Sequence, residues 1–100
     1  MTAHGAKRQT SIANALRGAV NEIDSLAARG RWREPDRREA RELLRISAEG
    51  TTGPREIAER FRAVARALGR ADRARTWQAI RRVAAPGLRT QLDKVYRNVL

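Results

Sequence analysis

The sequence contains no cysteine and only one histidine, His4, among its 100 residues. The lack of cysteine excludes disulfides and thiolate chemistry and fits a reducing compartment, so we expect a cytoplasmic protein. A metal cage of histidine and cysteine is excluded, and a Ser–His catalytic pair would depend on a lone imidazole. No apolar run approaches the roughly 18–20 residues of a membrane helix. We therefore expect no enzyme activity, no metal, no cofactor and no membrane partner.

Acidic residues are scarce as well. The 11 Asp and Glu stand against 22 Lys and Arg, which gives a formal net charge of +11. Such a balance is typical of proteins with a polyanionic partner, most often nucleic acid. Twenty of the basic residues are arginines, whose planar guanidinium binds phosphate with two hydrogen bonds and stays charged. A genome biased toward arginine explains the preference over lysine but not the shortage of acids, so we favour phosphate binding.

Strands are not supported, because no segment alternates polar and apolar residues with period two. Large aliphatic residues are few, but eighteen alanines favour closely packed helices, and the apolar residues recur at helical spacing. The sequence predicts an all-α protein, a compact bundle of about five short amphipathic helices. The expected apolar stripes are Ile12–Leu16–Val20–Ile23–Ala27 with Leu26, Ala40–Leu43–Leu44 with Ser47, Ile57–Phe61–Val64–Ala65–Leu68, Trp77–Ile80–Val83–Ala84, and Leu88–Leu92–Val95–Tyr96–Val99.

Glycine, proline and capping residues predict where these helices begin and end. Residues 1–9 show no apolar periodicity and are expected to form a flexible basic arm, with a transit peptide as the alternative. Residues 10–100 are expected to form a single helical domain. The five helices are predicted to start at Thr10 or Ser11, at Pro35, at Pro54, at Asp72 and after Pro86–Gly87. The first three are predicted to end at Gly30, Gly50 and Gly69, with Gly30 in the left-handed conformation that follows a helix.

Positive charge is concentrated between Arg60 and Arg82, where eight arginines accompany a single acid, Asp72. Helical spacing puts several of these arginines opposite the apolar stripes. We expect the third and fourth helices to lie side by side and to present a grid of guanidinium groups to successive phosphates. The candidate nucleic-acid-binding residues there are Arg55, Arg62, Arg66, Arg70, Arg73, Arg75, Arg81 and Arg82.

Two tryptophans lie among arginines. Trp32, between Arg31 and Arg33 and close to Arg29, is expected either to stack on an unpaired base or to plug the end of the bundle. We include these four residues among the candidate binding residues. Trp77 is expected in the core, because it lies in the middle of an apolar stripe.

Two other patterns in the sequence bear on function: a helix-turn-helix-like segment and a group of glutamates. The segment from Ala65 to Val83 invites comparison with a helix-turn-helix, but its apolar pair, Trp77 and Ile80, comes two residues late for that motif. The glutamates of the second and third helices are expected to pair with arginines at i+3 or i+4 and to interact with the helix dipoles. No catalytic pair is indicated.

In size, helicity and charge, residues 10–100 resemble the small subunits of CRISPR effector complexes. The residues that carry the resemblance are Arg55, Arg62, Arg66, Arg75 and Arg82, together with the stripe Leu88–Leu92–Val95–Val99. The resemblance implies a subunit that lines up with others along a nucleic-acid strand, holds backbone phosphates and serves antiviral defence.

The sequence therefore predicts a non-catalytic protein that binds the phosphate backbone of RNA or DNA through an arginine-rich helical face. The small core and the apolar last helix favour a subunit of a larger nucleoprotein or a self-associating protein. Two alternatives stay open: a DNA-binding protein of phage or plasmid type, like a helix-turn-helix protein, and an adaptor whose basic face meets an acidic protein.

Overall fold

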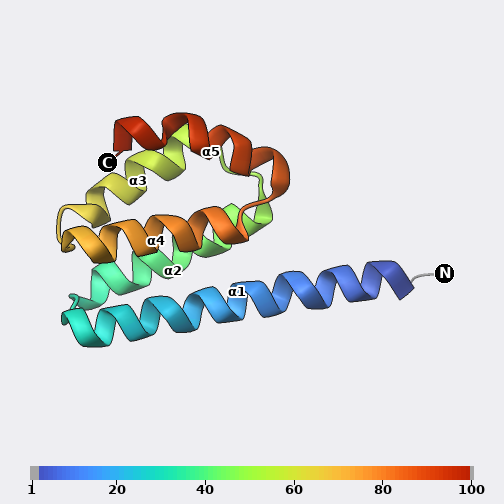
Figure 1. Cartoon of the computed structure of the whole chain (residues 1–100), viewed down its shortest axis with the longest axis horizontal. Coiled ribbons are helices and arrows are strands. Elements are labelled where there is room, and N and C mark those ends of the chain that lie inside the picture. Colours follow the sequence, from blue (N-terminus) through green and yellow to red (C-terminus); the bar gives the residue numbers. More distant parts are fainter. Residues whose placement is uncertain (1–2, 100) are drawn as a thin grey trace.

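The protein is an all-α bundle of five helices in the part of the chain that the structure covers (Figure 1). The structure, a computed structural model, describes the backbone of residues 3–99 and the side chains of residues 11–95. The helices are α1 (Ala3–Gly30), α2 (Glu34–Glu49), α3 (Pro54–Ala65), α4 (Arg70–Val83) and α5 (Pro86–Val99). Successive helices run in opposite directions, because each connection is only a few residues long.

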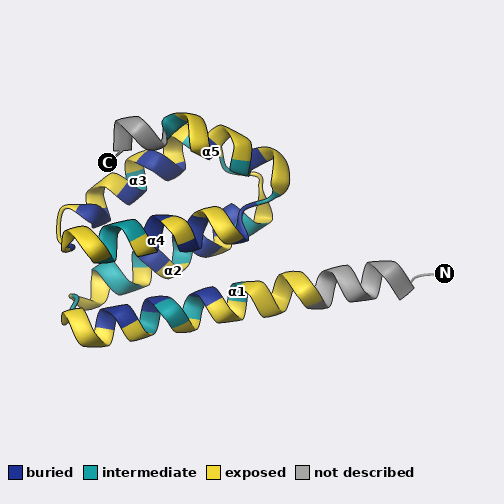
Figure 2. Ribbon diagram, in the orientation of Figure 1, coloured by how far each residue is buried: buried dark blue, intermediate teal, exposed yellow. Residues whose placement is uncertain are grey.

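The helices form a packed arrangement around α2 and α4. These two helices contact each other, α1 packs against both on one side, and α3 and α5 pack against each other and against α2 and α4 respectively. The core is built from the predicted stripes: Ile23, Leu43, Ile57, Phe61, Trp77, Ile80 and Leu92 are all almost inaccessible to solvent (Figure 2). The rings of Phe61 and Trp77 lie with their centroids 5.0 Å apart, so the prediction of a core position for Trp77 is confirmed.

The last helix packs on its own chain. Leu88 and Leu92 of α5 are buried, and Val95 is partly buried against the same core. Tyr96 and Val99, also predicted to be apolar contacts of this helix, lie outside the described side chains. The described part of the α5 ridge therefore belongs to the intramolecular core.

The first helix is longer than the sequence predicts. It begins at Ala3 rather than at Thr10 or Ser11, so the segment expected to form a flexible arm is helical from residue 3 onward. Its first half extends past the other helices (Figure 1). Ile12 is consequently 51% exposed and Leu16 only partly buried, although the periodicity placed both on a core-facing stripe.

Four helix ends also differ from the predictions. α3 ends at Ala65 rather than at Gly69, because the backbone tightens into turns from Arg66 to Leu68. Arg31, not Gly30, adopts the left-handed conformation after α1, with φ of 53°, and the Trp32 amide donates to the Ala27 carbonyl at 3.0 Å. The N-cap of α4 is Gly69, so Asp72 lies in the first turn of the helix and does not cap it. α5 begins at Pro86 itself. Gly50 ends α2 as expected, with φ of 77°.

Candidate nucleic-acid interface

Most carboxylates of the chain are engaged with arginines within or between helices. Among the described side chains, eight carboxylates form ion pairs with six arginines: Asp24 with Arg37 and Arg41, Glu34 with Arg37, Glu39 and Glu56 with Arg60, Glu42 and Glu49 with Arg45, Asp93 with Arg81, and Glu22 with Arg82. Several of these pairs join neighbouring helices. These pairs link adjacent helices and reduce the positive charge of the surfaces where they lie.

The pKa shifts in the structure have the same origin. Hydrogen bonds from Arg37, Arg45 and Arg81 lower the pKa values of the carboxyls of Glu34, Glu42 and Asp93, respectively, below their ordinary values. The arginine partners correspondingly have raised pKa values. These shifts are those of exposed ion pairs, and the predicted i+3 and i+4 pairing of the glutamates is confirmed for Glu42 with Arg45 and for Glu56 with Arg60.

Six arginines at one end of the bundle lack such partners. We call this surface the arginine end and define it as Arg29, Arg31, Arg33, Arg66, Arg70 and Arg75. The first three lie at or beside the α1–α2 turn, and the others lie in the α3–α4 connection or at the start of α4; Figure 1 shows both connections at the same end of the molecule. All six are exposed, and none forms an ion pair with a carboxylate of the described region.

Trp32 joins the two connections of the arginine end. Its Nε1 donates a hydrogen bond to Asp72 Oδ2 at 3.1 Å, and its half-buried ring packs against the core. We call this contact the Trp32–Asp72 clasp. Of the two predicted roles of Trp32, the geometry matches the one in which the ring covers the end of the core. Base stacking by its remaining exposed surface stays a prediction.

Gly30 makes room for the clasp. A Cβ atom at this position would lie 2.7 Å from Asp72 Oδ2 and 2.8 Å from Trp32 Nε1, closer than side-chain atoms approach one another. The α1 backbone therefore lies directly against the clasp. Arg31, which follows, has a left-handed conformation that costs a non-glycine residue about 1–2 kcal/mol. Such strain concentrates at functional sites.

The other candidate arginines are placed elsewhere. Arg55 begins α3 near the opposite end of the bundle, and Arg62 lies on the exposed side of α3. Arg81 and Arg82 are held in ion pairs with Asp93 and Glu22. Arg73 is half-buried, with its Nη2 3.4 Å from the Leu68 carbonyl oxygen and its Nε enclosed.

The structure brings together only part of the expected grid: Arg66 and Arg75 lie at the arginine end, whereas Arg82 is held in an ion pair with Glu22. The two helices face each other through Phe61 and Trp77, and both pack chiefly on other helices. Arg66 and Arg82 each lie five residues beyond one of these rings, about 140° around the helix. These two arginines therefore point away from the contact between the two rings.

The helix-turn-helix comparison stays a prediction. A recognition helix must expose one long side to enter a DNA groove. Here α4 packs against α1, α2 and α5, and its exposed residues follow one side of the helix from its first to its last turn: Arg70, Ala71, Arg75, Gln78, Arg81 and Arg82. Two of those six are held in ion pairs.

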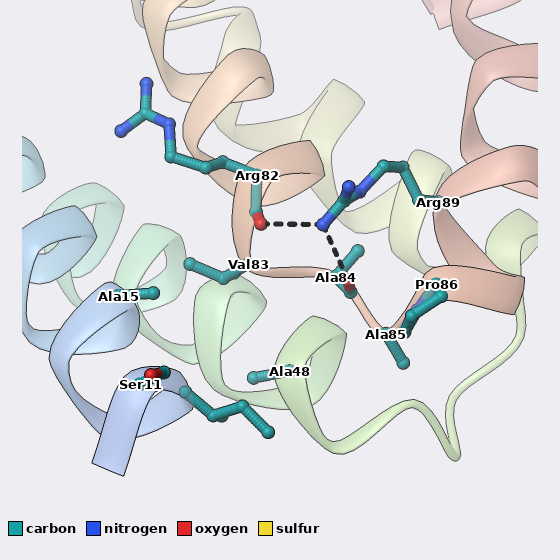
Figure 3. Close-up of a pocket in the computed structure, with 10 residues that line it drawn as sticks. Ser11, Ala15, Ala48, Arg82, Val83, Ala84, Ala85, Pro86 and Arg89 are labelled. Atoms are coloured by element: carbon teal, nitrogen blue, oxygen red, sulfur yellow. Dashed lines mark hydrogen bonds between the residues drawn. The ribbon is translucent and has the colours of Figure 1, made fainter. Parts of the chain in front are cut away.

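A groove of about 670 Å³ lies beside the α4–α5 connection, at the other end of the bundle. Small apolar residues such as Ala15, Ala48 and Ala84 line it (Figure 3). Arg89, on its edge, donates hydrogen bonds to the carbonyl oxygens of Arg82 at 3.0 Å and Ala84 at 3.4 Å, and its Nε donates to that of Arg81 at 3.1 Å. Arg89 thus caps the end of α4.

Comparisons of the chain with protein-family models, curated proteins and solved structures give no match. No helix in the described range is both long enough and apolar enough to cross a membrane. Within the same range, no three His, Cys, Asp or Glu side chains are grouped so that they could bind a metal ion.

Proposed function

We propose that this protein binds the phosphate backbone of nucleic acid through the arginine end, without catalysing a reaction on it. The observation that carries the proposal is the separation of charges in the bundle. Carboxylates pair with arginines along the contacts between helices, whereas six arginines from two connections and the start of α4 gather where no described carboxylate pairs with them. Guanidinium groups crowded together repel one another, and a polyanion removes that repulsion.

The chemistry of the arginine end favours backbone contacts over base recognition. Arginine binds phosphate oxygens with two parallel hydrogen bonds, and such contacts carry little sequence information. The bundle is 28 Å by 19 Å across its two shorter dimensions, so one end of it spans only a few nucleotides. A short footprint suits a subunit that binds beside others in a larger nucleoprotein, as the resemblance to CRISPR small subunits implies.

Fluorescence anisotropy with a labelled twelve-nucleotide oligouridylate tests the proposal. For three to five neutralised phosphates on a single strand, we expect the logarithm of the binding constant to fall with the logarithm of salt with a slope of about −2 to −4. Changing the base sequence should alter the binding constant little. Binding that does not respond to salt, or no binding at low salt, would refute the proposal and favour an acidic protein partner.

Two triple variants with the same loss of charge locate the site. The first replaces Arg29, Arg70 and Arg75 with glutamine, and the control replaces Arg17, Arg55 and Lys94, which are exposed and in no described ion pair. We expect the first variant to lose about two units of the salt slope, because each lost phosphate contact removes roughly 0.7. The control should keep nearly the whole slope. Equal losses would mean that net charge governs binding.

A further inference from the structure

The pocket between the end of α1 and the first turn of α4 combines cations with a carboxylate. It has a volume of about 330 Å³ and is lined by Arg29, Gly30, Ala71, Asp72 and Arg75. The two arginines come from different helices and are exposed. Although all three charged residues line one pocket, Asp72 forms an ion pair with neither arginine among the described contacts.

The clasp fixes the orientation of the Asp72 carboxylate. Oδ2 accepts the hydrogen bond from Trp32 Nε1, while Oδ1 has no hydrogen-bond partner in the described part of the chain. The α1 backbone at Gly30 lies directly against Asp72 Oδ2 and Trp32 Nε1, where a Cβ atom would clash with both. One carboxylate oxygen with its full capacity to accept hydrogen bonds is therefore presented beside two arginines.

A carboxylate is unfavourable in a pocket that binds phosphate alone, because two anions repel each other. It is favourable where the ligand brings a hydrogen-bond donor next to its phosphate. A ribonucleotide does so: its 2′-hydroxyl can donate a hydrogen bond and is adjacent to the 3′-phosphate, and DNA lacks that hydroxyl.

We propose that Asp72 Oδ1 accepts a hydrogen bond from a ribose 2′-hydroxyl while Arg29 and Arg75 bind the neighbouring phosphates, so that the protein prefers RNA to DNA. This inference rests on the proposed backbone binding and adds the ligand class. Asp72 is the specificity-determining residue, and Trp32 and Gly30 position it. The two arginines supply affinity for either nucleic acid.

The test compares three labelled twelve-nucleotide strands by anisotropy: oligouridylate, its 2′-fluoro analogue and oligodeoxyuridylate. The 2′-fluoro strand keeps the sugar pucker of RNA and a substituent of similar size, but it cannot donate a hydrogen bond. We expect the RNA to bind roughly tenfold more tightly than the 2′-fluoro strand, the low end for a hydrogen bond to a charged group. The deoxy strand should bind no better than the 2′-fluoro strand.

Two variants with the same change of charge identify the residue. Asp72→Ala removes the carboxylate and leaves no side-chain atom that can accept a hydrogen bond from the 2′-hydroxyl or donate one to it. We expect it to bind RNA and the 2′-fluoro strand equally. Glu59→Gln removes an exposed carboxylate of α3 and should keep the tenfold preference.

Each outcome bears on one of the two proposals. Equal binding of RNA and the 2′-fluoro strand by the unaltered protein, with a steep salt dependence, overturns the inference and leaves backbone binding intact. A preference that survives in Asp72→Ala shows that the hydroxyl is recognised elsewhere and overturns the assignment. Binding of none of the three strands overturns the proposed function and this inference with it.

Discussion

Replacing Gly30 with alanine tests whether the close approach of α1 to the clasp stabilises the fold. The added Cβ would lie 2.7–2.9 Å from atoms of Asp72 and Trp32, so the clasp must open. Losing its hydrogen bond costs about 1–2 kcal/mol, and the melting temperature of a domain of this size falls by about 4–8 °C per kcal/mol. We therefore expect Gly30→Ala to melt roughly 4–16 °C below a Gly18→Ala control, which carries the same change of residue on the same helix, in a thermal melt followed by circular dichroism.

Gly18→Ala is the matched control on the same helix. A Cβ at Gly18 meets nothing within 4 Å, so the substitution only removes the entropic cost of glycine in a helix, about 0.5–1 kcal/mol. We expect this variant to melt above the unaltered protein. In a Trp32→Phe background, which lacks the hydrogen bond, Gly30→Ala should cost less. If Gly30→Ala melted as high as Gly18→Ala, the clasp would contribute nothing to stability.

Three further predictions concern the rest of the bundle. Arg89→Met keeps the aliphatic stem but removes the donors that cap α4. We expect the free energy of unfolding, measured in urea, to fall by about 1–3 kcal/mol; an unchanged value would mean that water caps α4 equally well. Leu92→Ala removes a fully buried side chain and should lower the free energy of unfolding by about 2–5 kcal/mol. A variant that no longer self-associates but unfolds with the same free energy would show that α5 forms an interface. Arg81 lowers the pKa of Asp93, so this pair stabilises the protein above pH about 4 and the contribution disappears as pH falls through the lowered pKa. The melting temperature of Arg81→Gln should therefore lie below that of the unaltered protein at neutral pH and approach it near pH 2–3; a constant difference would contradict the assignment.

The fold could be predicted because its signals are local. Periodic apolar residues such as Leu43, Phe61 and Ile80 face the core wherever a neighbouring helix exists to cover them. Ile12 follows the same period and is exposed, because α1 extends past its neighbours. Periodicity identifies the face of a helix that is apolar, but not how far the partner reaches along it.

Helix ends were less predictable, since several residues compete for each capping position. Gly30 is the residue expected in the left-handed position, yet Arg31 occupies it, because the glycine is needed where the clasp lies against α1. Asp72 is the expected N-cap of α4, yet Gly69 caps it and Asp72 reaches Trp32, forty residues away. A tryptophan at a helix end needs a partner for its N–H, and Asp72 is the only acid between Arg60 and Arg82. A tryptophan at the end of one helix and a single acid in an arginine-rich segment together form the sequence signal for the clasp.

The composition of the site, but not its assembly, could be predicted. Sequence analysis selected the arginines around Trp32 and those at the start of α4 as separate groups, and the fold brings both to one end. It also grouped Arg82 with Arg75, although Glu22 from α1 engages Arg82 at 3.1 Å. Which arginine forms an ion pair with a carboxylate depends on which helices pack together. Helical periodicity within one segment carries no information about that packing.

The two connections that supply five of the six arginines of the arginine end contain no acidic residue: one reads Arg29-Gly30-Arg31-Trp32-Arg33 and the other runs from Arg66 to Ala71. Asp72, which follows directly, lines a pocket with Arg29 and Arg75, but one carboxylate among six arginines leaves the arginine end strongly positive. A ligand that binds here therefore relieves a repulsion present only in the folded state, where the two connections meet. It should stabilise the fold by RT ln(1 + [L]/Kd), about 2.7 kcal/mol at a hundredfold excess over Kd. Because salt screens both the repulsion and the binding, that stabilisation should shrink as salt rises. Such a dependence would link the stability of the bundle to occupancy of its arginine end.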